Sequence, residues 1–391
     1  MGKPLLVLLL VVVILAAGGY AALLYMTSVP GTSYQGALPP LTAEERALAA
    51  TLKGHIEAIA AREHNIAHYD ELEKAARYLE AALSSYGYTA GRQEYVVGGK
   101  TVRNIDAVIE PQTGIADPDV IVVGAHYDEL EKAARYLEAT LSAYGYTTDR
   151  QEYVVGGKTV RNIDAVIEPQ AGIADPEVIV LGAHYDSVED APGANDNASG
   201  TAAVLELARL LKDLQGRTRK RIRLVLFVNE EPPYFMTKDM GSLRYAEALA
   251  TRKERVTAMF SLETLGYYSD APGSQKYPFP FGLMFPDTGD FVAFVGLTNS
   301  RPLVQETMRS FRSHTSFPTV GGIAPVIIPG IGWSDHWAFG QYGFQGVMVT
   351  DTAPFRYPHY HEPTDTPDKV DTERLARVVK GMERVVRDLT R

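Results

Sequence analysis

The chain of 391 residues contains no cysteine. Disulfide bonds and thiolate metal sites are therefore excluded, and any metal ion must be held by His, Asp or Glu side chains. The chain also lacks a run of basic residues, and its formal net charge is −10 at pH 7. Because contacts to phosphate need clustered Lys and Arg, we expect no nucleic acid among its partners.

Charge is also missing from the N-terminal segment, where residues 5–26 form one apolar run. At about 1.5 Å per residue this run can cross a bilayer core of ~30 Å, so we expect residues 1–26 to form a transmembrane signal anchor. Lys3 and the amino terminus are the nearby positive charges, which favours a body outside the cytoplasm, periplasmic or extracellular. Cleavage near Gly18 is the alternative and would give a secreted protein. Residues 27–40 follow as a predicted linker.

Residues 68–125 and 126–183 are nearly identical copies, offset by 58 residues without a gap and differing at seven positions. Each copy predicts a helix, then a hairpin turning at Gly-Gly, then a continuous apolar run typical of a buried parallel strand. A tandem in-frame duplication explains this pattern, and an error of assembly in the underlying sequence is the alternative. One core has no need of both copies: we expect the strand before His184 to belong to the catalytic sheet, and which copy supplies the hairpin and the helix stays open.

The residues that can carry chemistry begin after the second copy, in the segment "HYDSVEDAPGANDNASG". His184 and Asp186 follow the end of the buried strand, and a loop rich in Gly and Asn brings in Asp196. An Asp two residues after a His can orient the imidazole of a metal ligand. Because a histidine at a strand end is often an ordinary packed residue, this motif alone leaves both interpretations open.

Carboxylates also occur at the ends of two later apolar segments. Glu230 and Glu231 end the segment "RIRLVLFVNEE", and two prolines follow them. Glu263 lies inside the apolar segment "AMFSLETLGYY", where an acid is costly unless it is paired or bound to a metal. An isolated Glu-Glu pair is more often a solvated turn. The pair therefore indicates a functional site only in combination with the other segments.

The C-terminal third adds two polar segments, "GWSDHWAF" and "YPHYHEPTDTPDK". The second contains Tyr360 and His361. For Asp335 and His336 in the first, simple packing and a role beside substrate or metal ligands are equally good interpretations. Ligands collect at the carboxyl ends of strands in alternating β/α sheets. Oxygen and nitrogen ligands in these numbers suit two Zn²⁺ ions that share one carboxylate.

Five motifs in order, "GAHYDSV…PGANDNASG", "NEEPP", "SLETLGYY", "SDHWAF" and "YHEPTDTPDK", together resemble metallopeptidase family twenty-eight, the co-catalytic di-zinc aminopeptidases. The resemblance runs from about Leu41 to the C-terminus, apart from the additional copy. It implies a zinc peptidase domain over residues 41–391. The implied fold is a three-layer αβα sandwich with a mixed, mostly parallel central sheet, and the implied activity is removal of N-terminal residues from peptides.

The same resemblance implies a role for each matching residue, with two Zn²⁺ per chain. His184 and Glu263 would hold one zinc ion. Glu231 and His361 would hold the other, and Asp196 would bridge the two. The position of Glu263 is often Asp in better-known members, so Glu263 would reach the metal with a longer side chain.

Catalytic roles are implied for two further acids. Glu230 would be the general base for a water activated by both ions, and Asp186 would orient His184. Asp335, His336 and Tyr360 would lie beside substrate or support the ligands. The family also implies a cis peptide bond between Asp196 and Asn197.

Two other functions fit parts of the same sequence. A glutaminyl cyclase-like acyl transferase resembles this fold but uses a single zinc ion, so metal stoichiometry would separate it from the peptidase. A non-catalytic membrane-anchored ectodomain would retain the fold and lose ligands or base, and here the full set is present. The triplet "HYD" occurs at His68, His126 and His184. Since the loop that delivers Asp196 follows only the last, we expect His184 to bind zinc.

Overall fold

The computed structural model describes residues 3–60, 90–97, 100–107, 129–155, 158–188 and 190–391. The chain divides into two compact units, one made of Arg62–Leu137 and the other of Met1–Ala61 with Glu138–Arg391. The metal-ligand candidates all belong to the second of these, which we call the main unit.

In the smaller unit, strands β1 (Ala90–Val97) and β2 (Lys100–Ala107) pair antiparallel. They form a two-stranded sheet of their own. The hairpin predicted for the first copy is therefore confirmed. The helix and the buried strand predicted for that copy, together with His68 and His126, lie outside the described residues.

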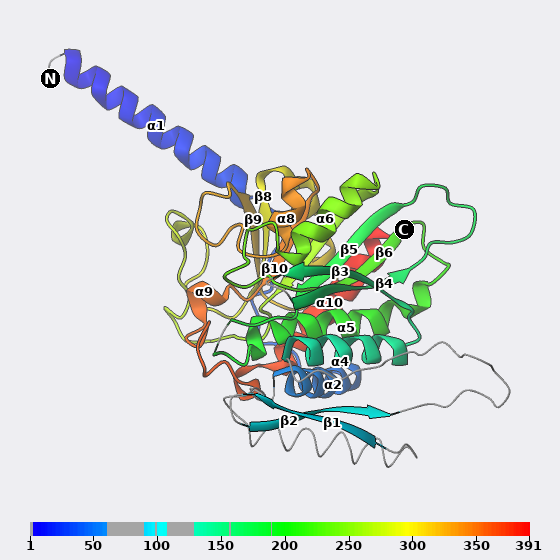
Figure 1. The fold of residues 1–391 in the computed structure, drawn as a ribbon. Helices are drawn as coiled ribbons and strands as arrows, with labels where there is room; N and C mark the ends of the chain where they lie inside the picture. The colour runs from blue at the N-terminus through cyan, green and yellow to red at the C-terminus, as the bar shows by residue number, and fades with distance from the viewer. Residues whose placement is uncertain (1–2, 61–89, 98–99, 108–128, 156–157, 189) are drawn as a thin grey trace. The chain divides into compact units, whose positions relative to one another are not determined.

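The main unit contains one sheet of eight strands (Figure 1), in the order β3-β4-β6-β5-β7-β10-β8-β9. The strands are β3 (Thr148–Val155), β4 (Lys158–Ile167), β5 (Glu177–His184), β6 (Arg221–Phe227), β7 (Arg255–Glu263), β8 (Val292–Leu297), β9 (Thr319–Ala324) and β10 (Gly346–Thr350). Strand β5 pairs parallel with β6 and β7, β7 with β10, and β8 with β9. The pairs β3–β4, β4–β6 and β8–β10 are antiparallel. The predicted mixed, mostly parallel sheet is confirmed.

Strands β3, β4 and β5 come from the second copy, which therefore fills the central sheet. The apolar run "VIVLGA" forms β5 because both faces of that strand are covered, and the strand is buried from Val178 to His184. The helix that the periodicity predicts in this copy is α4 (Glu129–Ala143). The sequence left open which copy supplies the hairpin of this sheet, and the pairing of β4 with β6 assigns it to the second copy.

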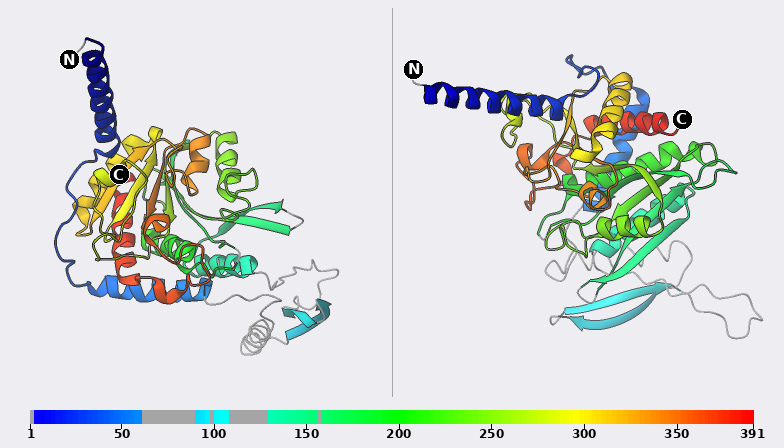
Figure 2. Two further views of the ribbon diagram at one scale, coloured as in Figure 1. Left: turned by 90° about the vertical axis from the view of Figure 1, so that its left-hand side faces the viewer. Right: turned by 90° about the horizontal axis from the view of Figure 1, so that it is seen from above.

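Helices cover both faces of the sheet (Figures 1 and 2) and complete the three layers. Helix α10 packs against α2, α5 and α7, while α6 packs against α8. Their bounds are α2 (Ala43–Ala60), α5 (Ser199–Leu211), α6 (Gly241–Thr251), α7 (Arg301–His314), α8 (His336–Gln341), α9 (Ala353–Arg356) and α10 (Thr372–Leu389). Helix α2 begins with a capping box, in which Thr42 accepts from the Glu45 amide and Glu45 accepts from the Thr42 amide.

Short helical turns occupy several connections of the main unit. They are a kinked turn at Ala194–Ala198, in which Asp196 and Asn197 are not helical, and 3-10 turns at Lys212–Leu214, Phe281–Leu283, Thr298–Ser300 and Pro367–Lys369. The kinked turn joins β5 to α5. Since β5, β6 and β7 are parallel, their carboxyl ends lie on the same side of the sheet, and this turn lies there too.

Helix α1 (Lys3–Thr27) contains the apolar N-terminal run. Its residues Val7–Thr27 are long and apolar enough to cross a membrane, by length and composition. Most of this helix is exposed, and its last turns approach β9. Hydrogen bonds tie the predicted linker to α7: Arg312 donates to the carbonyl oxygens of Pro30 and Gly31, at 2.9 and 2.7 Å.

Candidate metal centre

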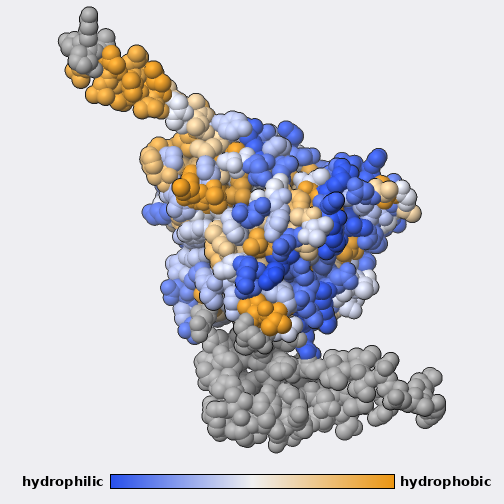
Figure 3. All heavy atoms as spheres, turned by 45° about the horizontal axis from the view of Figure 1, so that its top comes forward, coloured by the Kyte–Doolittle hydropathy of each residue, from blue (hydrophilic) through white to orange (hydrophobic). Residues whose placement is uncertain are grey.

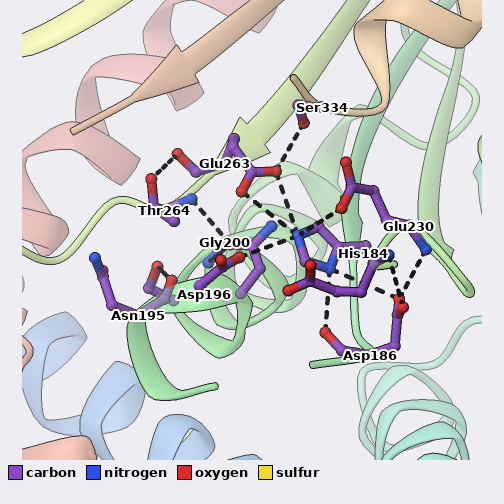
Figure 4. Close-up of polar contacts among 12 residues, drawn as sticks. His184, Asp186, Asn195, Asp196, Gly200, Glu230, Glu263, Thr264 and Ser334 are labelled. Atoms are coloured by element: carbon purple, nitrogen blue, oxygen red, sulfur yellow. Dashed lines mark hydrogen bonds and ion pairs between the residues drawn. The ribbon is translucent and has the colours of Figure 1, made fainter. Parts of the chain in front are cut away.

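The first group of potential ligands forms where β5 and β7 end. His184 is the last residue of β5 and Glu263 the last of β7, so the parallel pairing of these strands brings the two side chains together. The Nε2 atom of His184 lies 3.3 Å from Glu263 Oε2 and 3.3 Å from Asp196 Oδ1. All three side chains are buried. Figure 4 shows them pointing toward one another.

The second group shares Asp196 with the first. The Nε2 atom of His361 lies 3.2 Å from Asp196 Oδ2 and 3.3 Å from Glu231 Oε2. Asp196 thus presents one carboxylate oxygen to each group. In each group the candidate ligand atoms lie within 4.8 Å of one another. This is the arrangement that a carboxylate bridging two ions requires.

The loop that holds Asp196 is fixed by hydrogen bonds from several directions. The Asp365 carboxylate accepts from the backbone N–H groups of Asn195 and Asp196, at 2.8 and 3.0 Å. The bond between Asp196 and Asn197 is cis, as expected from the resemblance. A Cβ at Gly200 would lie 2.0 Å from the Leu262 carbonyl oxygen, so only glycine allows this close approach to β7.

Asp186 connects the end of β5 to the pair of glutamates after β6. Its two carboxylate oxygens accept from the backbone N–H groups of Glu230 and Glu231, at 3.2 and 3.1 Å. Its Oδ1 also lies 3.6 Å from Nδ1 of His184. One carboxylate thereby positions a histidine and two glutamates, which explains how adjacent residues of one chain segment can serve the same site.

Glu230 lies against the first group. Its Oε2 atom is 3.8 Å from His184 Nε2, and its side chain is buried (Figure 4). Burial raises the pKa of Glu230 well above its ordinary value, and the neighbouring carboxylates Glu263 and Glu231 raise it further. This geometry suits a carboxylate that exchanges a proton with something bound at the ligand groups.

The balance of charge in the cluster fits divalent cations. Burial raises the pKa values of Glu263 and Glu231 to about 7. Burial would also raise the pKa of Asp196, but hydrogen bonds from the two histidines outweigh it and lower this pKa. One buried polar atom of the cluster, Oε1 of Glu231, has no hydrogen-bond partner among the described residues. Metal coordination would satisfy this atom and compensate the concentrated acid.

A family comparison connects this geometry to known proteins. The sequence model of Peptidase family M28 matches residues 162–386, which include every candidate ligand as well as Asp186 and Glu230. The chain belongs to peptidase family M28. This membership confirms the resemblance drawn from the five motifs and supports a hydrolase that acts on peptides.

Individual relatives agree with the family. The uncharacterized protein YfbL of Escherichia coli (strain K12) is 36% identical over 292 residues, which cover 72% of this chain and 84% of that protein. Aminopeptidase YwaD of Bacillus subtilis (strain 168) is 28% identical over 258 residues, covering 65% of this chain and 48% of that protein. The chain thus spans about half the length of that aminopeptidase.

Among solved structures, the aminopeptidase from Aneurinibacillus sp. strain AM-1 shares the fold, with a TM-score of 0.51. It is 21% identical, and the match covers 89% of this chain and 95% of that chain. The predicted three-layer fold around a mixed sheet is confirmed by this likeness together with the strand order.

The M28 site includes supporting residues that the sequence motifs did not single out. Ser334 donates to Glu263 Oε2 at 2.7 Å, and Asp365 holds the Asp196 loop. Tyr357 donates to Asp365 at 2.6 Å. Asp365 lies in the segment "YHEPTDTPDK", so a carboxylate near His361 was a signal available in the sequence. Ser334 lies in the motif "SDHWAF", but nothing in that motif indicates that its hydroxyl donates to Glu263, 71 residues away along the chain.

The resemblance placed three residues beside substrate or the ligands without a specific role. They are Asp335, His336 and Tyr360, and each has different surroundings. The Tyr360 ring stacks on that of His361, with centroids 3.9 Å apart. Asp335 is fully buried, and burial raises its pKa to about 7. His336 is also buried, which lowers its pKa to about 4, and its Nε2 lies 2.8 Å from the Ile331 carbonyl oxygen. A neutral His336 therefore braces its own loop.

A largely apolar cavity of about 100 Å³ lies beside the ligand groups. Glu263 and Tyr360 are among its lining residues, and Phe281, Phe285 and Trp333 contribute aromatic walls. Such a cavity can accept an apolar side chain whose backbone lies at the metal centre.

Proposed function

We propose that this M28 protein is a zinc-dependent aminopeptidase with two Zn²⁺ per chain. One observation carries the proposal: the two carboxylate oxygens of Asp196 face two separate groups, each completed by a histidine and a glutamate. His184 and Glu263 would hold one ion, and Glu231 and His361 the other. Three oxygen or nitrogen ligands for each ion leave coordination positions for water and substrate.

When bound, a pair of zinc ions lowers the pKa of water and polarises a peptide carbonyl. The other steps fall to residues of the chain. Glu230 would accept the proton of the attacking water and donate it to the leaving amine, since it is not assigned as a ligand and its Oε2 atom lies 3.8 Å from His184 Nε2. Asp186 would hold both glutamates and His184 in register through its three contacts.

Two considerations support cleavage of the N-terminal residue alone: the likeness to the family and the cavity. The acidic cluster would attract a free α-amino group, and the apolar cavity beside Glu263 would take the side chain of the first residue. We therefore expect a preference for large apolar N-terminal residues over charged ones. Aminoacyl anilides of Leu, Phe, Asp and Lys provide the panel that measures this preference.

Replacement of Glu230 by Gln tests the catalytic assignment. The amide has nearly the same shape but cannot accept the proton, so we expect kcat to fall by about 10²–10⁴-fold, the usual contribution of a general base. Zinc content should stay unchanged. Glu362→Gln is the matched control, because Glu362 follows His361 and is exposed. Hydrolysis of Leu-anilide at the native rate by Glu230→Gln would show that another group is the base.

The proposal includes a location for the catalytic domain. Helix α1 has the length and apolar composition of a membrane anchor, and the positive charge at its N-terminal side favours a domain outside the cytoplasm. The remainder from residue 41 would be the peptidase domain, with residues 68–125 as a surplus copy of residues 126–183. Recovery of the mature chain with Met1 still present, in the membrane fraction, would support an uncleaved anchor.

A further inference from the structure

The exposed large apolar side chains of the described part of the main unit cluster in two loops. Outside α1 there are eight such side chains, and five of them lie in residues 277–285 and 325–333. These five are Phe279, Leu283, Val326, Ile327 and Trp333. We call these five residues the apolar loop surface. Phe279 is 86% exposed and Ile327 is 87% exposed. Side chains of this size at such exposure indicate a surface that meets an apolar partner.

Neither loop contains a charged residue, and together they border the end of helix α1. Leu23 of α1 is buried against Phe281 and Ala324. Ile328 and Ile331 pack against the same cluster, as does Met26 of α1. Figure 3 shows hydrophobic residues gathered on the body beside the base of α1, on a face that is otherwise largely hydrophilic. The apolar loop surface is therefore continuous with the apolar helix.

The chain after α1 is held in place, which keeps the end of the helix at these loops. Besides the bonds from Arg312, the backbone N–H of Thr319 donates to Ser33 Oγ at 2.8 Å. The guanidinium of Arg301 lies over the ring of Tyr25, 4.3 Å from its centroid. Aromatic and basic residues at a helix end are typical of the boundary between lipid and water.

We propose that the apolar loop surface docks on the bilayer that α1 crosses, with its side chains inserted among the lipids of the leaflet where α1 ends. The inference rests on the proposed role of α1 as a membrane anchor. A bilayer is the partner favoured because the surface continues directly from the apolar helix and contains no charge that would resist insertion.

This docking has a consequence for the cavity beside the metal centre. Phe281, Phe285 and Trp333 belong to the same two loops and form part of the cavity wall. The wall of the cavity would then border the lipid surface. Peptides whose N-terminal segment is adsorbed on the bilayer would reach the centre without first leaving the membrane.

The absence of native cysteine allows a direct test in the full-length chain, since each introduced cysteine is the only labelling site. Phe279→Cys and Ile327→Cys would carry an environment-sensitive fluorophore on the apolar loop surface. Val154→Cys is the matched control, because Val154 is an exposed apolar residue of β3, at the opposite edge of the sheet from β9. Leu15→Cys in α1 reports insertion of the anchor.

The four labelled chains are reconstituted in phosphatidylcholine liposomes with and without nitroxide-labelled lipid. We expect blue-shifted emission and strong quenching for the labels at 15, 279 and 327, and neither effect at 154. If the label at 15 is quenched but the labels at 279 and 327 are as unquenched as the control at 154, docking is overturned and the anchor still stands. Equal quenching at all four positions would show non-specific adsorption and also overturn docking. Absence of quenching at 15 would refute the anchor, and docking with it.

Native turnover of Leu-anilide by the labelled chains would show that each variant is folded. The same liposomes test a second substitution, Ile327→Asp, in a chain labelled at 279. Because a carboxylate resists transfer into lipid, we expect the quenching at 279 to decrease while the quenching of a label at 15 stays the same. Unchanged quenching at 279 in this variant would contradict insertion of the surface.

Discussion

The two copies of the duplicated segment differ in what they become. Among the described residues, strands β1 and β2 of the first copy form a separate two-stranded sheet, whereas β3 and β4 of the second copy are part of the eight-stranded sheet. Both hairpins have the same register, from Val97 opposite Lys100 in one and from Val155 opposite Lys158 in the other. Local sequence thus determines the hairpin, and its place in the fold depends on the next segment of the chain.

The second copy leads directly into the ligand-bearing loop. His184 ends β5, and the segment that delivers Asp196 follows it directly, so the second copy is the one that immediately precedes this loop along the chain. The first copy is followed by another helix instead. We infer that this adjacency, rather than any of the seven differences between the copies, decides which hairpin enters the sheet.

The largest effect should separate His126, which directly follows the first copy, from His184, which directly follows the second. We expect His184→Ala to reduce kcat/KM by about 10³-fold or more, because a zinc ion supplies several kcal/mol of transition-state stabilisation and about 1.36 kcal/mol is tenfold in rate. Zinc content, measured by mass spectrometry, should fall as well. His126→Ala is the control and should retain native activity and zinc content. A comparable loss for His126→Ala would place this histidine in the site.

The smallest effect should come from removing either copy. Deletion of residues 68–125 and deletion of residues 126–183 both leave one copy joined to His184, and the two products differ at only seven positions. If adjacency decides, we expect both shortened chains to fold and to hydrolyse Leu-anilide at the native rate. Deletion of residues 68–183 removes three sheet strands and should abolish folding. Activity in only one shortened chain would mean that the sequence differences matter.

Much of the main unit could be predicted from the sequence because its signals are local. The apolar run of β5, the Gly-Gly hairpin and the order of the five motifs each depend on neighbouring residues. The parallel pairing of β5 with β7 then brings His184 and Glu263 together, which is a general property of carboxyl strand ends.

The supporting residues could not be predicted in the same way because their contacts are distant in sequence. Ser334 reaches Glu263 from the loop before α8, and Asp365 reaches the Asp196 loop from 169 residues away. The attachment of residues 30–33 to α7 and β9 is equally non-local. Composition predicted residues 27–40 to be a linker, and composition says nothing about which residues a linker contacts.

The central claim is that Asp196 bridges two zinc ions. Anomalous X-ray diffraction at the zinc absorption edge, on crystals of the protein prepared with zinc, tests it directly. We expect two peaks on either side of Asp196, one near His184 and Glu263 and the other near Glu231 and His361. Asp196→Asn should weaken both. A single peak in the native protein would contradict the di-zinc site and favour the single-zinc, glutaminyl cyclase-like function.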